Sequence, residues 1–270
     1  MILRVMERGL TSNKMEDAES SAEDGGAELI TSPHQKGIYL LPNLLTTGTL
    51  FGGFYAILAS LDGRFEAAAI AVFVAMFFDG LDGRVARMTN TQSQFGVQYD
   101  SLSDMVAFGV APAVMMYTWM LQPVGTLGWA AAFIFVSCAA LRLARFNVQS
   151  ETADRKYFTG LASPPAAALL AGMVWSGAAL EPFTLLSVLL VIITAISGLL
   201  MVSNFRYYSF KEIDLRGRGP FILAVGVMVA ITIVIIDPPR VLMLMALTYV
   251  FSGPIAKLSS YLKTRVVSSS

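Results

Sequence analysis

The sequence predicts an all-α membrane protein, a polytopic helix bundle with about eight transmembrane helices. Hydrophobic residues make up 55% of the 270 residues and charged residues only 14%. The mean hydropathy is +0.63. This balance is typical of polytopic membrane proteins and argues against an ordinary soluble globular domain. The apolar residues also gather into stretches close to the roughly 20 residues that a helix needs to cross a bilayer.

Eight apolar stretches follow one another along the chain, separated by breaks such as Gln122-Pro123, Glu181-Pro182 and Asp237-Pro238-Pro239. We expect Asp237 and Ser163, each followed by proline, to cap the helices that begin there. The polar, acid-rich residues 1–35 are expected to form a disordered cytoplasmic tail, and residues 258–270 a second cytoplasmic tail. The expected spans are 38–60, 65–86, 101–121, 126–147, 162–180, 182–203, 218–236 and 239–257.

The distribution of basic residues predicts the orientation. An even number of spans places both termini on one side of the membrane. All of the 19 Lys and Arg residues except Arg64 and Arg240 then fall on that side. By the positive-inside rule this side is cytoplasmic, so we expect a multi-pass protein of the cytoplasmic membrane with both termini inside. The net charge is zero, and no nucleic-acid partner is expected.

Four aspartates dominate the stretch DGLDGRVARMTNTQSQFGVQYDSLSD, residues 79–104. Asp79 and Asp82 are three residues apart and Asp100 and Asp104 four, so each pair shares one helix face. Four unpaired aspartates inside a bilayer would cost on the order of 10 kcal/mol. They are therefore expected in a water-accessible cavity, near an interface or around cations. Carboxylate oxygens suit Mg²⁺ or Mn²⁺, and the absence of Cys and His from this stretch disfavours zinc.

A simpler interpretation is that interfacial aspartates pair with Arg84 and Arg87. It accounts for two carboxylates more easily than for four. The small residues Gly83, Ala86 and Gly96 between them also favour a ligand site, because they let a ligand approach the helix backbone.

The pattern Asp79-x2-Asp82-Gly83-x2-Ala86-Arg87-x8-Gly96-x3-Asp100-x3-Asp104 resembles the signature of the CDP-alcohol phosphotransferases, with every fixed position filled. The resemblance implies a six-helix core over residues 36–203 and two additional helices over 204–257. It also implies that Asp79, Asp82, Asp100 and Asp104 hold two divalent ions, Mg²⁺ or Mn²⁺. Asp104 is in addition the candidate general base.

The segment Pro42-Asn43-Leu44-Leu45-Thr46-Thr47 opens the first span. Helix N-termini favour phosphate, although ordinary capping would also explain these polar residues. The family resemblance extends to this segment. It implies that the nucleotide and its phosphates contact Asn43, Thr46, Asp82, Gly83, Ala86 and Arg87.

The segment Arg142-Leu-Ala-Arg145-Phe-Asn147 ends the fourth span. Its arginines are either interfacial anchors or a fork for a substrate carboxylate or phosphate, to which Asn147 could add a hydrogen bond. With residues 158–168 and 202–211, the segment resembles the phosphatidylserine synthase branch of the family. This resemblance implies transfer of a phosphatidyl group from CDP-diacylglycerol to L-serine in a lipid membrane, tentative serine contacts from Arg142, Arg145 and Asn147, and a homodimer. Gly48-x3-Gly52 permits a close helix contact.

Two alternatives stay open. The same chemistry can use another acceptor, such as glycerol 3-phosphate, inositol phosphate or choline. A protein of another class, a cation-coupled transporter, would also bind ions with membrane carboxylates. That class predicts carboxylates near mid-membrane and inverted repeats, whereas these aspartates are expected at one membrane end.

Overall fold

The computed structural model describes residues 33–89, 91, 93–149, 157–208 and 220–267. Residues 39–270 form one compact unit, and residues 1–38 form a separate one. The predicted N-terminal tail lies outside the described residues, except that the first described helix already begins at Pro33.

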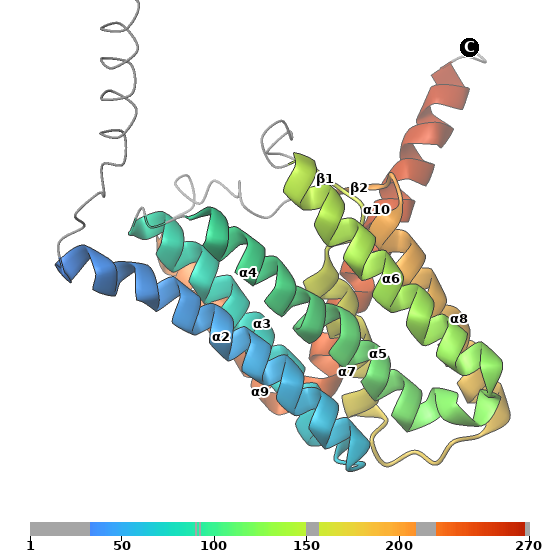
Figure 1. The fold of residues 1–270 in the computed structure, drawn as a ribbon. Coiled ribbons are helices and arrows are strands. Elements are labelled where there is room, and N and C mark those ends of the chain that lie inside the picture. Colours follow the sequence, from blue (N-terminus) through green and yellow to red (C-terminus); the bar gives the residue numbers. More distant parts are fainter. Residues whose placement is uncertain (1–32, 90, 92, 150–156, 209–219, 268–270) are drawn as a thin grey trace, which may run out of the picture. The chain divides into compact units, whose positions relative to one another are not determined.

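The described residues are almost wholly helical, as the sequence predicts (Figure 1). Two short strands are the exception, β1 (Tyr157–Thr159) and β2 (Arg206–Tyr208), which pair antiparallel. The helices are α2 (Pro33–Leu61), α3 (Phe65–Met88), α4 (Gln94–Asp104), α5 (Ala111–Met116), α6 (Thr126–Gln149), α7 (Ser163–Ser176), α8 (Thr184–Val202), α9 (Pro220–Ile236) and α10 (Pro238–Val267).

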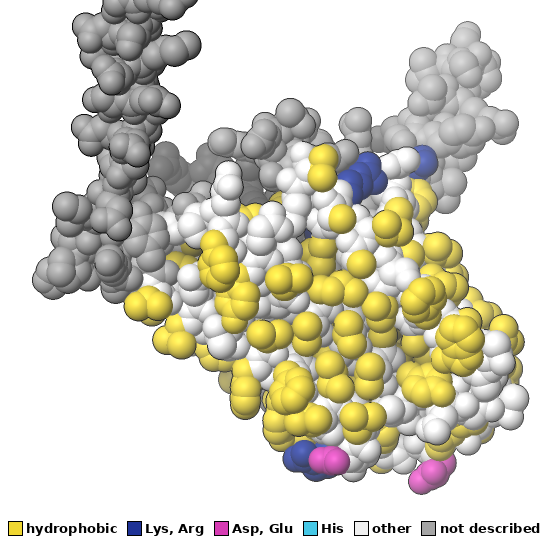
Figure 2. All heavy atoms as spheres, viewed as in Figure 1, with side chains coloured by type: hydrophobic (Ala, Val, Ile, Leu, Met, Phe, Trp, Pro, Cys, Tyr) yellow, Lys and Arg dark blue, Asp and Glu magenta, His cyan; other side chains and the backbone are white. Residues whose placement is uncertain are grey.

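Each predicted span coincides with a helical segment, and within the described residues four helices are long and apolar enough to cross a membrane. They are Leu40–Leu61, Gln94–Val124, Thr126–Val148 and Thr184–Val202. Hydrophobic side chains cover the middle of the face in Figure 2, with charged side chains only towards its two ends. The chain is therefore a membrane protein. A count of eight crossings is not confirmed, since α7 and α9 have only 14 and 17 residues.

The third helical segment begins earlier than the sequence predicts. The expected span starts at 101, whereas the helix starts at Gln94 and continues to Val124, with π-helical stretches at Met105–Val110 and Tyr117–Leu121. The reason is a helix cap, because the Ser93 hydroxyl accepts a hydrogen bond from the Gly96 amide at 3.0 Å. Asp100 and Asp104 consequently lie inside a helix rather than at its start.

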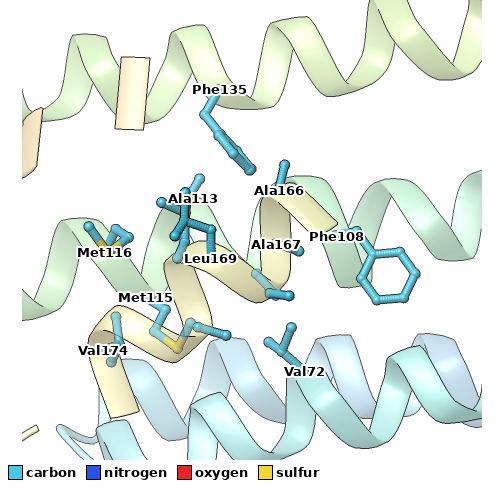
Figure 3. Packing of buried hydrophobic residues seen from close by; sticks show 14 of the residues in the cluster. Val72, Phe108, Ala113, Met115, Met116, Phe135, Ala166, Ala167, Leu169 and Val174 are labelled. Atoms are coloured by element: carbon cyan, nitrogen blue, oxygen red, sulfur yellow. The ribbon is translucent and has the colours of Figure 1, made fainter. Parts of the chain in front are cut away.

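Helix α7 forms the centre of the core. Its Ala166, Ala167, Leu169 and Val174 lie between Phe135 of α6 and Val72 of α3 (Figure 3). Residues 166–171 of α7 are all buried, which fits a helix that is apolar on every side.

Close helix contacts depend on glycine. A Cβ on Gly172 of α7 would lie 2.8 Å from the Met243 Cα of α10. A Cβ on Gly52 would lie 2.9 Å from the Ala75 Cβ of α3. The Gly48-x3-Gly52 pattern therefore serves a contact between α2 and α3 of the same chain.

Only one of the two predicted caps forms. The Asp237 carboxylate accepts from the Arg240 amide at 3.4 Å and pairs with its guanidinium at 2.9 Å, as expected for a residue preceding α10. The Ser163 prediction is wrong, because Ser163 is itself the first residue of α7 and makes no capping bond. Its buried hydroxyl instead accepts a hydrogen bond from Arg142 Nη1 at 2.8 Å.

Candidate active site

The aspartates of α3 and α4 converge into one group, here called the carboxylate cluster: Asp79, Asp82, Asp100 and Asp104. One carboxylate oxygen from each of Asp79, Asp82 and Asp100 lies within 4.8 Å of the other two. Hard divalent cations bind oxygens at about 2.0–2.6 Å, so oxygens spaced by up to about 5 Å can share one ion. These three carboxylates could therefore hold a metal ion.

Asp104 joins this group through Asp79. The two carboxyl groups are close enough to hydrogen-bond when one of them carries a proton. The Oδ1 atoms of Asp100 and Asp104 are buried and have no hydrogen-bond partner among the described residues. Buried carboxylate oxygens without partners are unfavourable, and a bound cation would relieve this cost.

Thr46 links α2 to the cluster. Its buried hydroxyl lies 2.7 Å from Asp82 Oδ2, to which it donates. A hydrogen bond of this kind fixes the orientation of a carboxylate that must bind a ligand. Nearby, Thr47 Oγ1 lies 2.9 Å from the Tyr99 hydroxyl and joins α2 to α4. Figure 1 shows α2, α3 and α4 side by side.

The residues predicted to bind nucleotide surround an open part of this site. Beside a Cβ placed on Gly83, the nearest described atom is Arg87 Nη1 at 3.9 Å. Arg87 is exposed and Ala86 half-buried. Asn43 of α2 approaches the start of α4, since its Oδ1 would lie 3.5 Å from a Cβ on Gly96.

The three predicted acceptor residues of α6 take different partners. Arg142 donates to Ser163 and lies close enough to Asp104 and Asp79 to interact with both carboxylates electrostatically. Arg145 instead donates to Asn204 Oδ1 at 3.4 and 3.5 Å. Asn147 Nδ2 donates to Ser101 Oγ at 3.0 Å, next to Asp100 in sequence.

Sequence reasoning missed four residues around the site: Tyr99, Ser101, Ser163 and Tyr249. Tyr99 and Ser101 flank Asp100, so their positions beside a candidate ligand were a usable signal. Tyr249 lies in α10, in the neighbourhood of the Arg142 guanidinium. No spacing along the chain relates position 249 to position 142. Helix α7 connects the two regions, because α10 packs on α7 and Ser163 of α7 accepts a hydrogen bond from Arg142.

Comparison with known proteins identifies the family. The family model for CDP-alcohol phosphatidyltransferases matches residues 39–200, which include the whole carboxylate cluster, Thr46 and Arg142. The chain belongs to the CDP-alcohol phosphatidyltransferase family. It is thus an enzyme, a transferase of phospholipid biosynthesis. Helices α9 and α10 lie beyond the matched range.

Curated relatives of this CDP-alcohol phosphatidyltransferase cover most of its length. A CDP-diacylglycerol–serine O-phosphatidyltransferase of Helicobacter pylori is 37% identical over 224 residues, which is 80% of this chain and 90% of that protein. An archaetidylserine synthase of Methanothermobacter thermautotrophicus is 38% identical over 169 residues, 62% of this chain and 69% of that protein. A crystal structure of Mycobacterium tuberculosis phosphatidylinositol phosphate synthase is 20% identical, covers 61% of this chain and 86% of that chain, and superposes with a TM-score of 0.42. A superposition this loose supports no structural argument.

Proposed function

We propose that this family member transfers the phosphatidyl group of CDP-diacylglycerol to L-serine, releasing CMP and phosphatidylserine. The observation that supports the proposal is the surroundings of Asp104, which interacts electrostatically both with the other carboxylates and with the Arg142 guanidinium. In these surroundings, Asp104 can take a proton from the hydroxyl of the acceptor while the Arg142 guanidinium binds the carboxylate of the same acceptor. The names of the Helicobacter pylori relatives support the same acceptor.

Binding of the donor, CDP-diacylglycerol, explains why the site contains several carboxylates. Its diphosphate is anionic and would be repelled by Asp79, Asp82 and Asp100 alone. The spacing of these carboxylates and the unpartnered buried oxygen of Asp100 fit hard divalent cations, Mg²⁺ or Mn²⁺. Two such ions, when bound, would neutralise the phosphates and the charge that develops on the leaving CMP. The chain's own task is to hold the ligand oxygens in place, to which Thr46 contributes by orienting Asp82.

Asp104 acts as general base for the serine hydroxyl. The serine oxygen bonds to the phosphorus of the phosphatidyl group, the bond from that phosphorus to the CMP oxygen breaks, and the hydroxyl proton passes to Asp104 directly or through one water. A two-step transfer through a covalent enzyme intermediate is the alternative order of events. In both cases, Asp104 must lie within hydrogen-bonding reach of the hydroxyl that reacts.

The nucleotide occupies the open side of α3. The space beside Gly83 and the small side chain of Ala86 admit the flat cytidine, and the exposed Arg87 reaches a phosphate. Asn43 lies near Gly96 at the α2–α4 junction and adds a polar contact to the same ligand. Thr46 acts indirectly, since its hydroxyl is directed at Asp82.

For the acceptor, Arg142 is the better candidate of the two arginines. It lies near Asp104, whereas Arg145 donates to Asn204 at the junction of α8 and β2. Asn147 contributes through Ser101, which joins α6 to the α4 face that carries Asp100 and Asp104.

The proposal extends to the topology. We propose eight spans with cytoplasmic termini, divided into a six-helix core over residues 36–203 and two further helices over 204–257. This arrangement puts the carboxylate cluster at the cytoplasmic headgroup level. The basic residues on that side support this orientation. We also propose a homodimer, on the basis of the family resemblance alone.

Acceptor competition tests the proposal. Purified protein in lipid nanodiscs is given CDP-diacylglycerol, Mn²⁺ and one labelled acceptor at a time: serine, glycerol 3-phosphate, inositol phosphate or choline. Phosphatidylserine should form at a rate at least tenfold above any other product. If another acceptor reacts faster, that compound rather than serine is the acceptor in the same phosphatidyl-transfer reaction. Ion uptake into proteoliposomes without CMP release would instead favour a cation-coupled transporter.

A further inference from the structure

Helix α7 begins with a buried serine. Ser163 has no exposed surface, and no polar side chain follows it in α7 before Trp175. A hydroxyl buried in such apolar surroundings is unfavourable unless it is hydrogen-bonded. Its partner is the Arg142 guanidinium, whose Nη1 donates to Ser163 Oγ at 2.8 Å. This contact ties the end of α6, which carries the candidate acceptor arginine, to the start of α7.

The backbone that leads into Ser163 is fixed by hydrogen bonds to α8 and β2. We call residues 160–163 the elbow. The Gly160 amide donates to the Phe205 carbonyl at 2.8 Å, and the Leu161 amide donates to the Leu200 carbonyl at 3.0 Å. Gly160 has a φ of +84°, which favours glycine, and a Cβ there would overlap a carbonyl oxygen of the last turn of α8. The elbow therefore has little freedom to move away from α8.

Two prolines fix the chain on the other side of Ser163. Pro164 and Pro165 form the first turn of α7, and the proline ring holds φ near −65°. The buried residues that follow pack α7 against its neighbours. Ser163 thus presents its hydroxyl to Arg142 from a backbone that is held at both ends.

We propose that Ser163 is a positioning residue for Arg142, so that the elbow takes part in recognition of the acceptor carboxylate. This inference rests on the proposed function of Arg142. An arginine side chain has many rotamers, and its fork suits a carboxylate only when the plane of the guanidinium is fixed. A hydrogen bond from Nη1 to a rigidly held oxygen selects one orientation and leaves the remaining N–H groups for the acceptor.

The test is the kinetics of Ser163→Ala, which removes one oxygen atom and adds nothing to the packing. Losing a hydrogen bond to a charged group should raise the KM for serine roughly tenfold. The KM for CDP-diacylglycerol should stay within about twofold of wild type, and kcat should change little, because Arg142 binds the acceptor rather than the reacting atoms. An unchanged serine KM, or an equal rise in both KM values, would overturn the inference.

Ser187→Ala is the matched control. Ser187 is a buried serine of α8 whose hydroxyl has no hydrogen-bond partner among the described residues. Its removal should leave both KM values unchanged. Ser163→Thr keeps an oxygen that can accept from Arg142, so its serine KM should stay within about threefold of wild type. A tenfold rise in Ser163→Thr would count against the hydroxyl as the group that matters, even if Ser163→Ala did not fold.

A double variant separates positioning from a general packing effect. Arg142→Ala removes the guanidinium, so in that background Ser163→Ala should raise the serine KM less than about twofold further, because residues that act through one another are non-additive. A full further tenfold rise would show that Ser163 acts independently of Arg142 and would overturn the inference.

Failure of this inference differs from failure of the proposed function. If wild-type protein forms no phosphatidylserine, the proposed acceptor is wrong whatever the variants do. If Arg142→Ala leaves the serine KM unchanged, the proposed role of Arg142 is wrong. If Arg142→Ala raises the serine KM and Ser163→Ala matches wild type, only the role of Ser163 is wrong.

Discussion

At the scale of single residues, the site combines groups that would each be unfavourable alone. Asp100 and Asp104 have buried oxygens without partners among the described residues, and the Arg142 guanidinium interacts electrostatically with Asp104 and Asp79. The cost of burying each charged group is offset by the other groups and by ligands bound between them. Predictions at this scale therefore concern the division of roles among the carboxylates and their neighbours.

Asp104→Asn should lower kcat at least 100-fold, because a general base contributes on the order of 10²–10⁴ to the rate. The change is nearly isosteric, so the variant should insert and purify like wild type. Phosphatidylserine formation under saturating substrates measures it. Asp62→Asn is the control, since Asp62 pairs with Arg64 in the exposed α2–α3 turn. Normal turnover by Asp104→Asn would eliminate Asp104 as the base.

Thr46→Val should raise the metal concentration needed for half-maximal activity roughly 10- to 100-fold, since it removes the hydrogen bond that orients Asp82. The maximal rate at saturating Mn²⁺ should recover most of the wild-type value. Thr232→Val offers a matched comparison, because within the described part of the chain that hydroxyl donates only to the Met228 carbonyl of its own helix. An identical metal titration for Thr46→Val and wild type would contradict this role.

Arg145→Ala tests the other arginine of α6. The Arg145 guanidinium donates to Asn204 rather than approaching Asp104, so we expect less than a threefold rise in the serine KM. Arg142→Ala should raise it at least tenfold, as expected for loss of a charge-assisted hydrogen bond. The reverse order of effects would assign acceptor binding to Arg145.

At the scale of helices, the carboxylate cluster depends on close approach of α2, α3 and α4. Gly52 of α2 allows contact with Ala75 of α3, and a Cβ on Gly53 would lie 2.6 Å from the Ala107 Cα. Ala107 belongs to the π-helical stretch that follows Asp104. The packing that joins these helices is thus directly connected to the residues that carry the chemistry.

Gly53→Val should lower the stability of the fold by roughly 1–3 kcal/mol or more, because the new side chain overlaps backbone atoms that cannot move aside easily. Thermal unfolding in detergent reports the loss. Gly226→Val places the same side chain on α9, where a Cβ meets nothing within 4 Å, and should be neutral. Equal midpoints for the two variants would show that α2 does not pack as described.

The helical segments were predictable to a useful degree, because apolar stretches between proline and glycine breaks are a strong signal. The start of the third segment was not, since it depends on one cap from Ser93 within a polar turn. The four aspartates and Thr46 stood out by type and spacing. The partners Ser163 and Tyr249 did not, because long-range packing rather than local periodicity brings them to the site.

At the scale of the whole molecule, the basic residues predict which membrane face carries the site. In a Cys138→Ala background, Thr89→Cys after α3 should react with an impermeant thiol reagent only in inside-out vesicles. Asp62→Cys in the α2–α3 turn should react only in intact cells or right-side-out vesicles. Both positions are exposed. Labelling of both from the same side would contradict the proposed orientation.

The central claim is that the carboxylate cluster uses divalent metal to transfer a phosphatidyl group to serine. The most direct measurement is release of CMP together with labelled phosphatidylserine from CDP-diacylglycerol, followed as Mn²⁺ or Mg²⁺ is titrated into metal-free protein. We predict equal amounts of the two products, no turnover in EDTA, and loss of activity in Asp100→Asn at every metal concentration. Undiminished phosphatidylserine formation in EDTA, or full activity of Asp100→Asn, would contradict the account.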